Sequence, residues 1–215
     1  MDNTIINFYS KIPILNVSRE TCFDFESLIS MIREKNNQIN IISKKTAKIN
    51  EIRERHIIDS AQIIDFVDIN SNTTYDLGSG AGLPGLVVAI VMKNLKVDMK
   101  VSLFEKSYHK CAFLKDVSKE LNLNTEVIQK DIFKLKNMET GTIMSRAFKP
   151  MPLVLNLVNE NFKRFKNIIF FMGKNGKKVL KETLQHWDLD YEEKKSLTNE
   201  DSFILNIKKI KKKLS

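Results

Sequence analysis

Four of the seven glycines of this chain lie in one ten-residue run, Asp76 to Gly85, which has the composition of a nucleotide-binding loop. Glycine adopts positive φ without strain and lets a ligand approach the main chain closely. The run follows a β-like stretch, residues 73–77, and leads into an apolar stretch, residues 86–92, that is suited to a helix. A strand, a glycine turn and a helix N-terminus form a nucleotide-sized site at the carboxyl edge of a sheet. The residues expected to bind a ligand here are Asp76, Gly78, Ser79, Gly80, Gly82, Leu83 and Pro84.

Two kinds of cofactor fit this loop. Residues 80–85 match the GxGxxG pattern of dinucleotide-binding proteins, although a single match is weak. Alternatively, Asp76 and the glycines that follow it resemble motif I of methyltransferases that use S-adenosylmethionine (AdoMet). A carboxylate at the strand end suits the cationic methionine moiety of AdoMet and would oppose a pyrophosphate, although Asp76 could instead cap a helix or a turn. Glu105 ends the next expected strand and suits the ribose of either cofactor, unless it is an ordinary surface acid.

The rest of the chain predicts a helical segment followed by an α/β domain. The spacing of apolar residues predicts helices around residues 25–33 and 50–66. Beyond residue 70, strands and helices alternate, which predicts a mostly parallel sheet. We expect strands at 73–77, 100–105, 126–129, 142–145, 167–172, 191–197 and 202–207, and helices at 85–93, 108–121, 153–164 and 176–187.

The last two expected strands are separated by about four residues, which is too few for a crossover helix, so they should form an antiparallel hairpin. A parallel sheet that ends in such a hairpin is typical of class I methyltransferases rather than of dehydrogenases. We therefore predict a Rossmann-like, mostly parallel seven-stranded sheet with an antiparallel last strand. Residues 1–70 would form a helical N-terminal extension, and residues 71–215 the AdoMet-binding domain.

Charge and composition restrict the partners. The net charge is +9, and residues 161–181 and 208–213 are rich in lysine, which favours a polyanionic partner such as RNA or only a solvated surface. Cys22 and Cys111 are isolated, which argues against a disulfide framework and a cysteine-based metal site. Without a signal peptide or an apolar run long enough to span a bilayer, we expect a cytoplasmic, metal-free monomer with no membrane partner.

Three blocks in the chain point to a family. They are Arg55-His-Ile-Ile-Asp-Ser60, the glycine run from Asp76 to Gly85, and Ser145-Arg-Ala-Phe148. In this order they closely resemble RsmG (also called GidB), the family of bacterial 16S ribosomal RNA guanine-N7 methyltransferases. The resemblance extends to Asn36 and Asn40, to Glu105 and residues 110–114, and to Met172-Gly-Lys174, so it spans nearly the whole chain.

The resemblance implies that AdoMet binds at the glycine loop and that a methyl group is delivered to N7 of one guanine. In the family this guanine lies in a loop near the decoding centre, and the assembled small ribosomal subunit is the best substrate. The chain departs from the family after the third strand, where Gln129-Lys-Asp131 stands. Lys130 and Asp131 are expected to bind the cofactor here, and either Asp131 or a backbone amide would contact the adenine. A tryptophan that is common in the family is Lys35 here.

Guanine N7 carries a lone pair and no proton, so its methylation needs alignment rather than a strong general base. The chain agrees, since it lacks the Asn/Asp-Pro-Pro-aromatic motif of amino-group methyltransferases after the fourth strand. At that place, Arg146 is expected to serve catalysis and cofactor binding, contacting the guanine O6 face or an RNA phosphate, unless it forms a salt bridge to a helix. Phe148 is expected to stack on the base, unless it is a core aromatic. RNA contacts are also expected from Arg55, Lys174 and Lys177, whereas His56 is interpreted as structural.

Three other functions stay open. A small-molecule methyltransferase of the same fold is disfavoured by the basic segments. A nicotinamide-dependent oxidoreductase is disfavoured by Asp76 and by the terminal hairpin. A non-catalytic factor that binds ribosomal RNA and keeps AdoMet as a structural ligand would share every motif described above.

Overall fold

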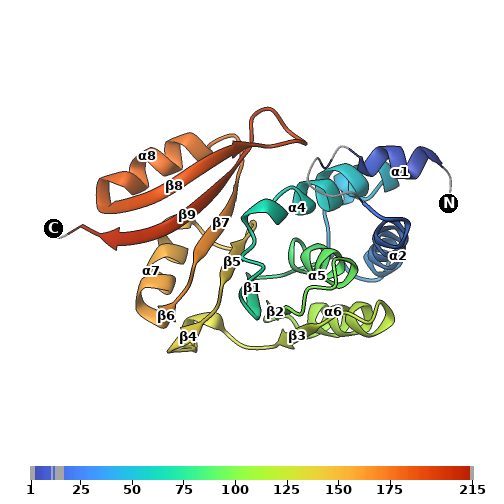
Figure 1. Ribbon diagram of the computed structural model, residues 1–215, viewed down its shortest axis with the longest axis horizontal. Coiled ribbons are helices and arrows are strands. Elements are labelled where there is room, and N and C mark those ends of the chain that lie inside the picture. The colour runs from blue at the N-terminus through green and yellow to red at the C-terminus, as the bar shows by residue number, and fades with distance from the viewer. Residues whose placement is uncertain (1–2, 11, 13–16, 214–215) are drawn as a thin grey trace.

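A seven-stranded sheet with the order β3-β2-β1-β5-β7-β9-β8 forms the centre of the molecule (Figure 1). The structure, a computed structural model, describes residues 3–10, 12 and 17–213. Strand β9 runs antiparallel to β7 and β8, whereas the pairings of β1, β2, β3, β5 and β7 with one another are parallel. The predicted fold class is thereby confirmed. The strands are β1 (Thr73–Leu77), β2 (Lys100–Phe104), β3 (Thr125–Ile128), β5 (Thr142–Ser145), β7 (Asn167–Met172), β8 (Trp187–Lys195) and β9 (Phe203–Lys212).

Helices cover both faces of the sheet, and each face has its own hydrophobic core. Alternate residues along a strand point to opposite faces, so Met144 packs in one core and its neighbour Ile143 in the other. The first core contains residues of α1 (Asn3–Tyr9), α2 (Arg19–Asn36), α4 (Asp59–Ala61), α5 (Gly85–Asn94) and α6 (Tyr108–Glu120). The second contains residues of α7 (Met151–Asn161) and α8 (Gly176–His186).

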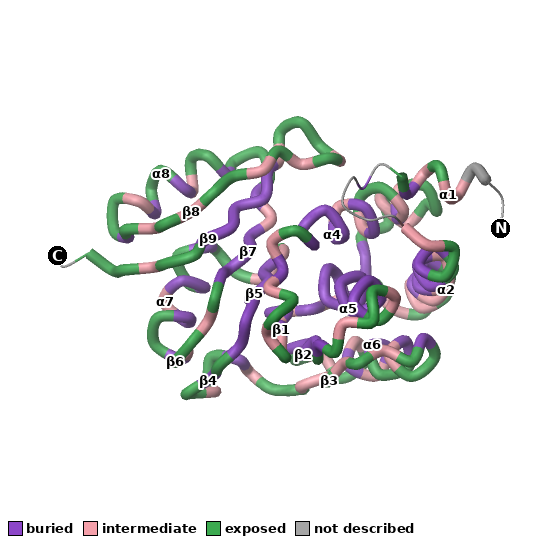
Figure 2. The backbone as a smooth tube through the Cα atoms, in the orientation of Figure 1, coloured by how far each residue is buried: buried purple, intermediate pink, exposed green. Residues whose placement is uncertain are grey.

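Helix α5 joins the sheet to the N-terminal helices. Its residues 85–92 are all buried, because it contacts β2 on one side and α2 and α4 on the other (Figure 2). A helix that is apolar all round is stable only when it is enclosed in this way. Apolar residues from the described part of the first seventy positions therefore pack into the same core as α5 and α6.

The helix predicted over residues 50–66 is confirmed only in part. Helical structure runs from Ile49 to Ala61 as α3 (Ile49–Ile52), a π-helical turn (Arg53–Ile58) and α4, and after a turn a separate 3₁₀ turn (Ile64–Phe66) follows. Within the π-turn, the carbonyl of Arg55 accepts a hydrogen bond of 2.6 Å from Nη2 of Arg146. A side chain that enters a helical hydrogen-bond ladder distorts it. Apolar periodicity cannot reveal a partner 91 residues away.

Two further predicted helices were too long. Helix α7 ends at Asn161, and Phe162–Arg164 form β6, which pairs in parallel with the short strand β4 (Met138–Glu139). Helix α8 ends at His186, because Trp187 begins β8 opposite Lys212 and is buried in the second core. The β8–β9 hairpin is longer than predicted, since β9 continues through the lysine-rich residues 208–212. After a register shift at Lys208, residues 209–212 pair with β8. Short 3₁₀ turns occur at Lys44–Thr46 and Ile132–Lys134.

A buried amide joins three strands and the segment before the sheet. Oδ1 of Asn167 accepts a hydrogen bond from Thr142 on β5, at 2.8 Å. Its Nδ2 donates to Oδ1 of Asn206 on β9 and to the carbonyl of Phe66, both at 2.7 Å. Asn167 thus occupies the point where the parallel part of the sheet meets the antiparallel strand.

The substitution Asn167→Ala should lower the free energy of unfolding by about 2–3 kcal/mol, because it removes three hydrogen bonds, two of them buried and one partly buried. Urea denaturation followed by circular dichroism measures this loss. Asn124→Ala, at an exposed side chain, serves as the control and should change stability by less than about 0.5 kcal/mol. Equal, small losses in both variants would contradict the structural role of Asn167.

Candidate active site

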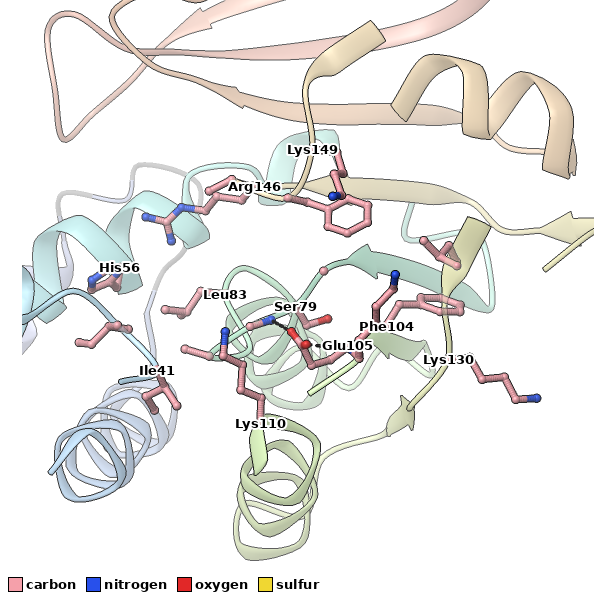
Figure 3. A pocket seen from close by; sticks show the side chains of 18 residues that line it. Ile41, His56, Ser79, Leu83, Phe104, Glu105, Lys110, Lys130, Arg146 and Lys149 are labelled. Atoms are coloured by element: carbon pink, nitrogen blue, oxygen red, sulfur yellow. Dashed lines mark hydrogen bonds between the residues drawn. The ribbon is translucent and has the colours of Figure 1, made fainter. Parts of the chain in front are cut away.

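A pocket of about 500 Å³ lies at the carboxyl edge of β1, β2 and β5 (Figure 3). The glycine loop lines it with residues 78–81 and Leu83, and the ends of β2 and β5 line it with residues 104–106 and 146–149. Ile41 and Ile42, in the loop after α2, and His56, in the π-helical turn, close it from the N-terminal segment. The remaining lining residues are Lys110, Lys130 and Ile132. The pocket therefore needs both the sheet domain and the N-terminal segment.

The glycine loop has two kinds of glycine. A side chain at Gly80, where φ is +57°, would meet nothing closer than the carbonyl oxygen of Gly78, at 3.8 Å. At Gly82, where φ is +83°, a Cβ would lie 2.2 Å from the side chain of Leu86 and 2.9 Å from that of Leu114. Gly80 therefore leaves room for a ligand against the backbone, whereas Gly82 lets the loop pack on the core.

Glu105 lies in the middle of the pocket and is held there by backbone donors. Its Oε2 accepts from the N–H of Gly80 at 2.9 Å, and its Oε1 accepts from Lys106 and Ser107, each at 2.8 Å (Figure 3). These bonds fix the carboxylate and leave acceptor capacity for a ligand hydroxyl. The sequence predicted that β2 would end at Glu105, whereas the strand ends at Phe104 and Glu105 is the residue directly after it.

Asp76 does not line the pocket. Its side chain is buried, and its Oδ2 accepts a hydrogen bond of 3.0 Å from the N–H of Gly85, the first residue of α5. Burial raises the pKa of Asp76 to about 7, against the lowering effect of this hydrogen bond. The sequence left two roles open for Asp76: binding the methionine moiety of AdoMet, or capping a helix or a turn. The hydrogen bond to Gly85 corresponds to the capping role.

Arg146 connects the end of β5 to the N-terminal segment, and it lines the pocket. Its Nη2 lies 3.0 Å from Oδ2 of Asp59 and donates to the carbonyl of Arg55, and its Nη1 lies 3.4 Å from Oγ of Ser60. Figure 3 shows the guanidinium turned toward the segment that carries His56. Burial lowers the pKa of Arg146, and the nearby carboxylates of Asp59 and Asp76 oppose this effect. The sequence analysis gave a salt bridge to a helix as the alternative role of Arg146. This salt bridge is present, since Arg146 pairs with Asp59 of α4 while it also lines the pocket.

Phe148 also lines the pocket and packs beneath the glycine loop. A Cβ on Gly78 would lie 2.1 Å from its ring, so the position of this ring requires a glycine at residue 78. The intervening residue, Ala147, has φ of +50°, a conformation that costs an L-residue roughly 1–2 kcal/mol. The strained residue lies between the two side chains that the sequence assigned to the acceptor base.

His56 is a half-buried part of the pocket wall. Its Nε2 lies 2.9 Å from the hydroxyl of Thr46. Its Nδ1 is buried without a hydrogen-bond partner, and among the described residues no other buried side-chain nitrogen or oxygen atom lacks one. Burial, together with the charges of Arg146 and Arg55, lowers the pKa of His56 to about 4, so the ring is neutral at neutral pH.

The other predicted site residues lie outside the pocket wall, except Lys130. Asp131 forms an ion pair of 2.7 Å with Lys106, and Arg55 forms one of 2.8 Å with Glu51. Lys177 pairs with Glu193 and lies over the ring of Phe203. Gly82, Pro84 and Lys174 do not line the pocket either, although Lys174 follows β7 at the same edge of the sheet.

The basic segment 161–181 is divided by β7. Residues 163–166 precede this strand and residues 174–181 follow it, so the two groups lie at opposite edges of the sheet. Ile207 pairs with Ile168 at the start of β7, which places the lysines from 208 onward at the edge away from the pocket. Of the two basic segments, only the residues after β7 lie at the edge that carries the pocket.

Several pocket residues were not predicted from the sequence. Ile41 and Ile42 are held by Asn36, whose Oδ1 accepts from both of their backbone N–H groups at 3.0 Å. Asn36 belongs to the motifs that carry the family resemblance, so it was the signal that could have revealed this wall. Lys106, Lys110 and Lys149 also line the pocket, and Figure 3 shows Lys110 directed into it from α6.

Within residues 3–10, 12 and 17–213, no cluster of three or more His, Cys, Asp or Glu side chains could hold a metal ion. None of the helices in this part of the chain is long and apolar enough to cross a membrane.

Comparison with known proteins agrees with the sequence motifs. Residues 21–205 match the family model described as rRNA small subunit methyltransferase G. The protein of that name from Pelagibacter ubique (strain HTCC1062) is 59% identical over 208 residues, which cover 95% of this chain and 98% of the relative. The one from Rickettsia felis is 31% identical over 93% of this chain and 99% of the relative.

Solved structures share the fold at low sequence identity. The 16S rRNA methylase RmtB has a TM-score of 0.53 at 10% identity, covering 92% of this chain and 78% of its own. A mutant of MtNAS in complex with S-adenosylmethionine has a TM-score of 0.55 at 14% identity, covering 88% of this chain and 76% of its own. At these identities the likeness concerns the fold alone.

The two kinds of glycine should respond differently to substitution. Gly80→Asp should weaken AdoMet binding by at least about 100-fold, because its carboxylate enters the space left for the ligand, while the protein stays folded. Gly82→Ala should lower the free energy of unfolding by about 2 kcal/mol or more, because its methyl group overlaps Leu86. Isothermal titration calorimetry and thermal unfolding measure the two effects. Normal AdoMet binding by Gly80→Asp would show that the ligand does not lie against this loop.

Proposed function

The chain belongs to the rRNA small subunit methyltransferase G family, and from this premise we propose that it transfers a methyl group from AdoMet to N7 of a guanine in 16S rRNA. The observation that carries the proposal is the composition of the pocket wall. It combines the glycine loop, the carboxylate of Glu105 held by backbone N–H groups, and the lysines Lys106, Lys110, Lys130 and Lys149. The substrate would be the small ribosomal subunit, at a loop of the decoding region.

The pocket residues fit AdoMet. Gly80 leaves room for a ligand at the backbone, and Glu105 is held where it can accept hydrogen bonds from ribose hydroxyls. Lys130 and Ile132 follow β3 and would flank the adenine. The methionine end of AdoMet would then lie on the opposite side of the pocket, near Arg146 and His56. Asp76 would act from beneath the loop, by fixing the start of α5.

The chemistry requires alignment of two groups rather than removal of a proton. When bound, AdoMet supplies a methyl group on a positively charged sulfur, and the lone pair of guanine N7 accepts it. Glu105 is the one carboxylate among the pocket-lining residues, and three backbone N–H groups engage it, so it is a ligand holder rather than a base. Phe148 would stack on the guanine, and Arg146 would keep the pocket wall in place, so that the reacting atoms meet in line.

The RNA backbone would follow the basic edge of the sheet. Lys149 at the pocket and Lys174 beyond β7 are exposed, and both lie at the carboxyl edge of neighbouring strands. Phosphate groups that flank the target guanine would contact these lysines, and Arg55 and Lys177 if they leave their present carboxylate partners. The protein would act as a cytoplasmic monomer without a metal ion.

The proposal is tested by incubating the protein with methyl-labelled AdoMet and small subunits from a strain that lacks the enzyme. Label should appear as 7-methylguanine, and borohydride and aniline treatment should cleave the rRNA at one site. AdoMet binding without methyl transfer would favour a non-catalytic rRNA-binding factor. Label in small metabolites alone would favour a small-molecule methyltransferase, and either result overturns the proposal.

A further inference from the structure

The unpaired nitrogen of His56 has a defined chemical state. The single hydroxyl proton of Thr46 is donated to the carbonyl of Ser43, at 3.1 Å. The hydroxyl oxygen of Thr46 can then only accept from Nε2 of His56, at 2.9 Å, so Nε2 carries the ring proton. A neutral imidazole has one donor and one acceptor, and Nδ1 is therefore an acceptor whose lone pair has no partner within the described residues.

Leaving a buried acceptor unpaired is costly, commonly by about 1–3 kcal/mol, and such an atom beside a pocket suggests a ligand that supplies a donor. Figure 3 shows His56 and Ile41 at one side of the pocket and Phe104 and Lys130 at the other, with Glu105 between them. His56 therefore lies on the side assigned above to the methionine end and the acceptor base. It belongs to a π-helical turn, and such turns occur frequently at functional sites.

Two groups on this side could donate to Nδ1: the α-ammonium of AdoMet and the guanine base. The guanidinium groups of Arg146 and Arg55 are close enough to shift the titration of His56, and they would repel an ammonium ion. A neutral N–H donor meets no such repulsion. Guanine offers N1–H and the N2 amine on its Watson–Crick edge, and a contact there leaves N7 free to react.

We propose that Nδ1 of His56 accepts a hydrogen bond from the Watson–Crick edge of the target guanine and thereby selects guanine over adenine. The inference rests on the proposed function, because it assumes guanine as the acceptor. Adenine has no proton at N1 and no N2 amine, and its Watson–Crick donor, the N6 amine, stands where guanine carries O6. An acceptor placed against N1–H and the N2 amine of guanine would therefore stay unpaired with adenine. Thr46 is a positioning residue in this arrangement, since it fixes the tautomer and the ring.

Nδ1 is enclosed in the structure, so the base reaches it only after a small shift of the pocket wall. The segment that carries Ile41, Ile42 and Thr46 lies beside it and contains a single 3₁₀ turn as regular structure. Side-chain adjustment in this segment is the rearrangement that the contact requires.

Two substitutions separate base recognition from a structural role. The amide of asparagine lies near the position of Nδ1 and can keep an acceptor there, whereas the longer glutamine reaches the position of Nε2 and keeps the contact with Thr46. The substrates are small subunits reconstituted with 16S rRNA that carries guanosine or adenosine at the methylated position. His109→Gln, at an exposed position, is the control and should behave as wild type.

His56→Gln should lower the preference of kcat/KM for guanosine over adenosine roughly 10- to 100-fold. His56→Asn should retain most of that preference, and both variants should bind AdoMet within about twofold of wild type, because the contact is made by the base. A larger loss in His56→Asn than in His56→Gln, equal losses, or a loss explained by weaker AdoMet binding would overturn the inference. Failure of the wild-type protein to form 7-methylguanine would instead refute the proposed function.

Discussion

The guanidinium of Arg146 is the contact on which the pocket depends. It joins the end of β5 to Asp59, to Ser60 and to the carbonyl of Arg55, segments that are distant in the sequence. Asp59 in turn accepts from Thr198 in the β8–β9 turn, at 2.8 Å. Loss of either charged partner would leave the other largely buried and unpaired, which is far more costly than the net value of the pair. The sheet, the N-terminal helices and the terminal hairpin therefore meet at one ion pair.

This arrangement suits a reaction that needs positioning rather than proton transfer. The acid in the pocket is engaged by three backbone donors, and the histidine is neutral. What the pocket supplies is shape: a loop without side chains at Gly80, an aromatic ring under Gly78 and an apolar wall at Ile41 and Ile42. The pocket wall comes from two separate parts of the chain, so it can hold a cofactor and a base in a fixed relation only if those parts are rigidly joined. Arg146 joins them through Asp59 and the carbonyl of Arg55.

Local pattern predicted the sheet well, because strand alternation, the glycine run and the short connection before the hairpin are all local features. The bounds of β1, β5 and β7 are those that the sequence predicted. Long-range contacts were out of reach. The π-helical turn after Ile52 contacts Arg146, the strand at the lysine-rich end pairs with β8, and the positive φ of Ala147 has no sequence signal. At the site, Gly80 and Glu105 were placed from spacing alone, whereas the direction of Asp76 toward α5 and the unpaired nitrogen of His56 required coordinates.

The central claim, that the Arg146–Asp59 pair builds the pocket for methyl transfer, is tested most directly by a double-mutant cycle. Arg146→Gln, Asp59→Asn and the double variant are compared in kcat/KM for small subunits, with the exposed pair Arg164 and Glu139 as a control cycle. We expect each single substitution to cost nearly as much as both together, with a coupling energy of about 1–3 kcal/mol, and a control coupling near zero. Additive effects at Arg146 and Asp59 would show that the two residues act independently, and would contradict this account.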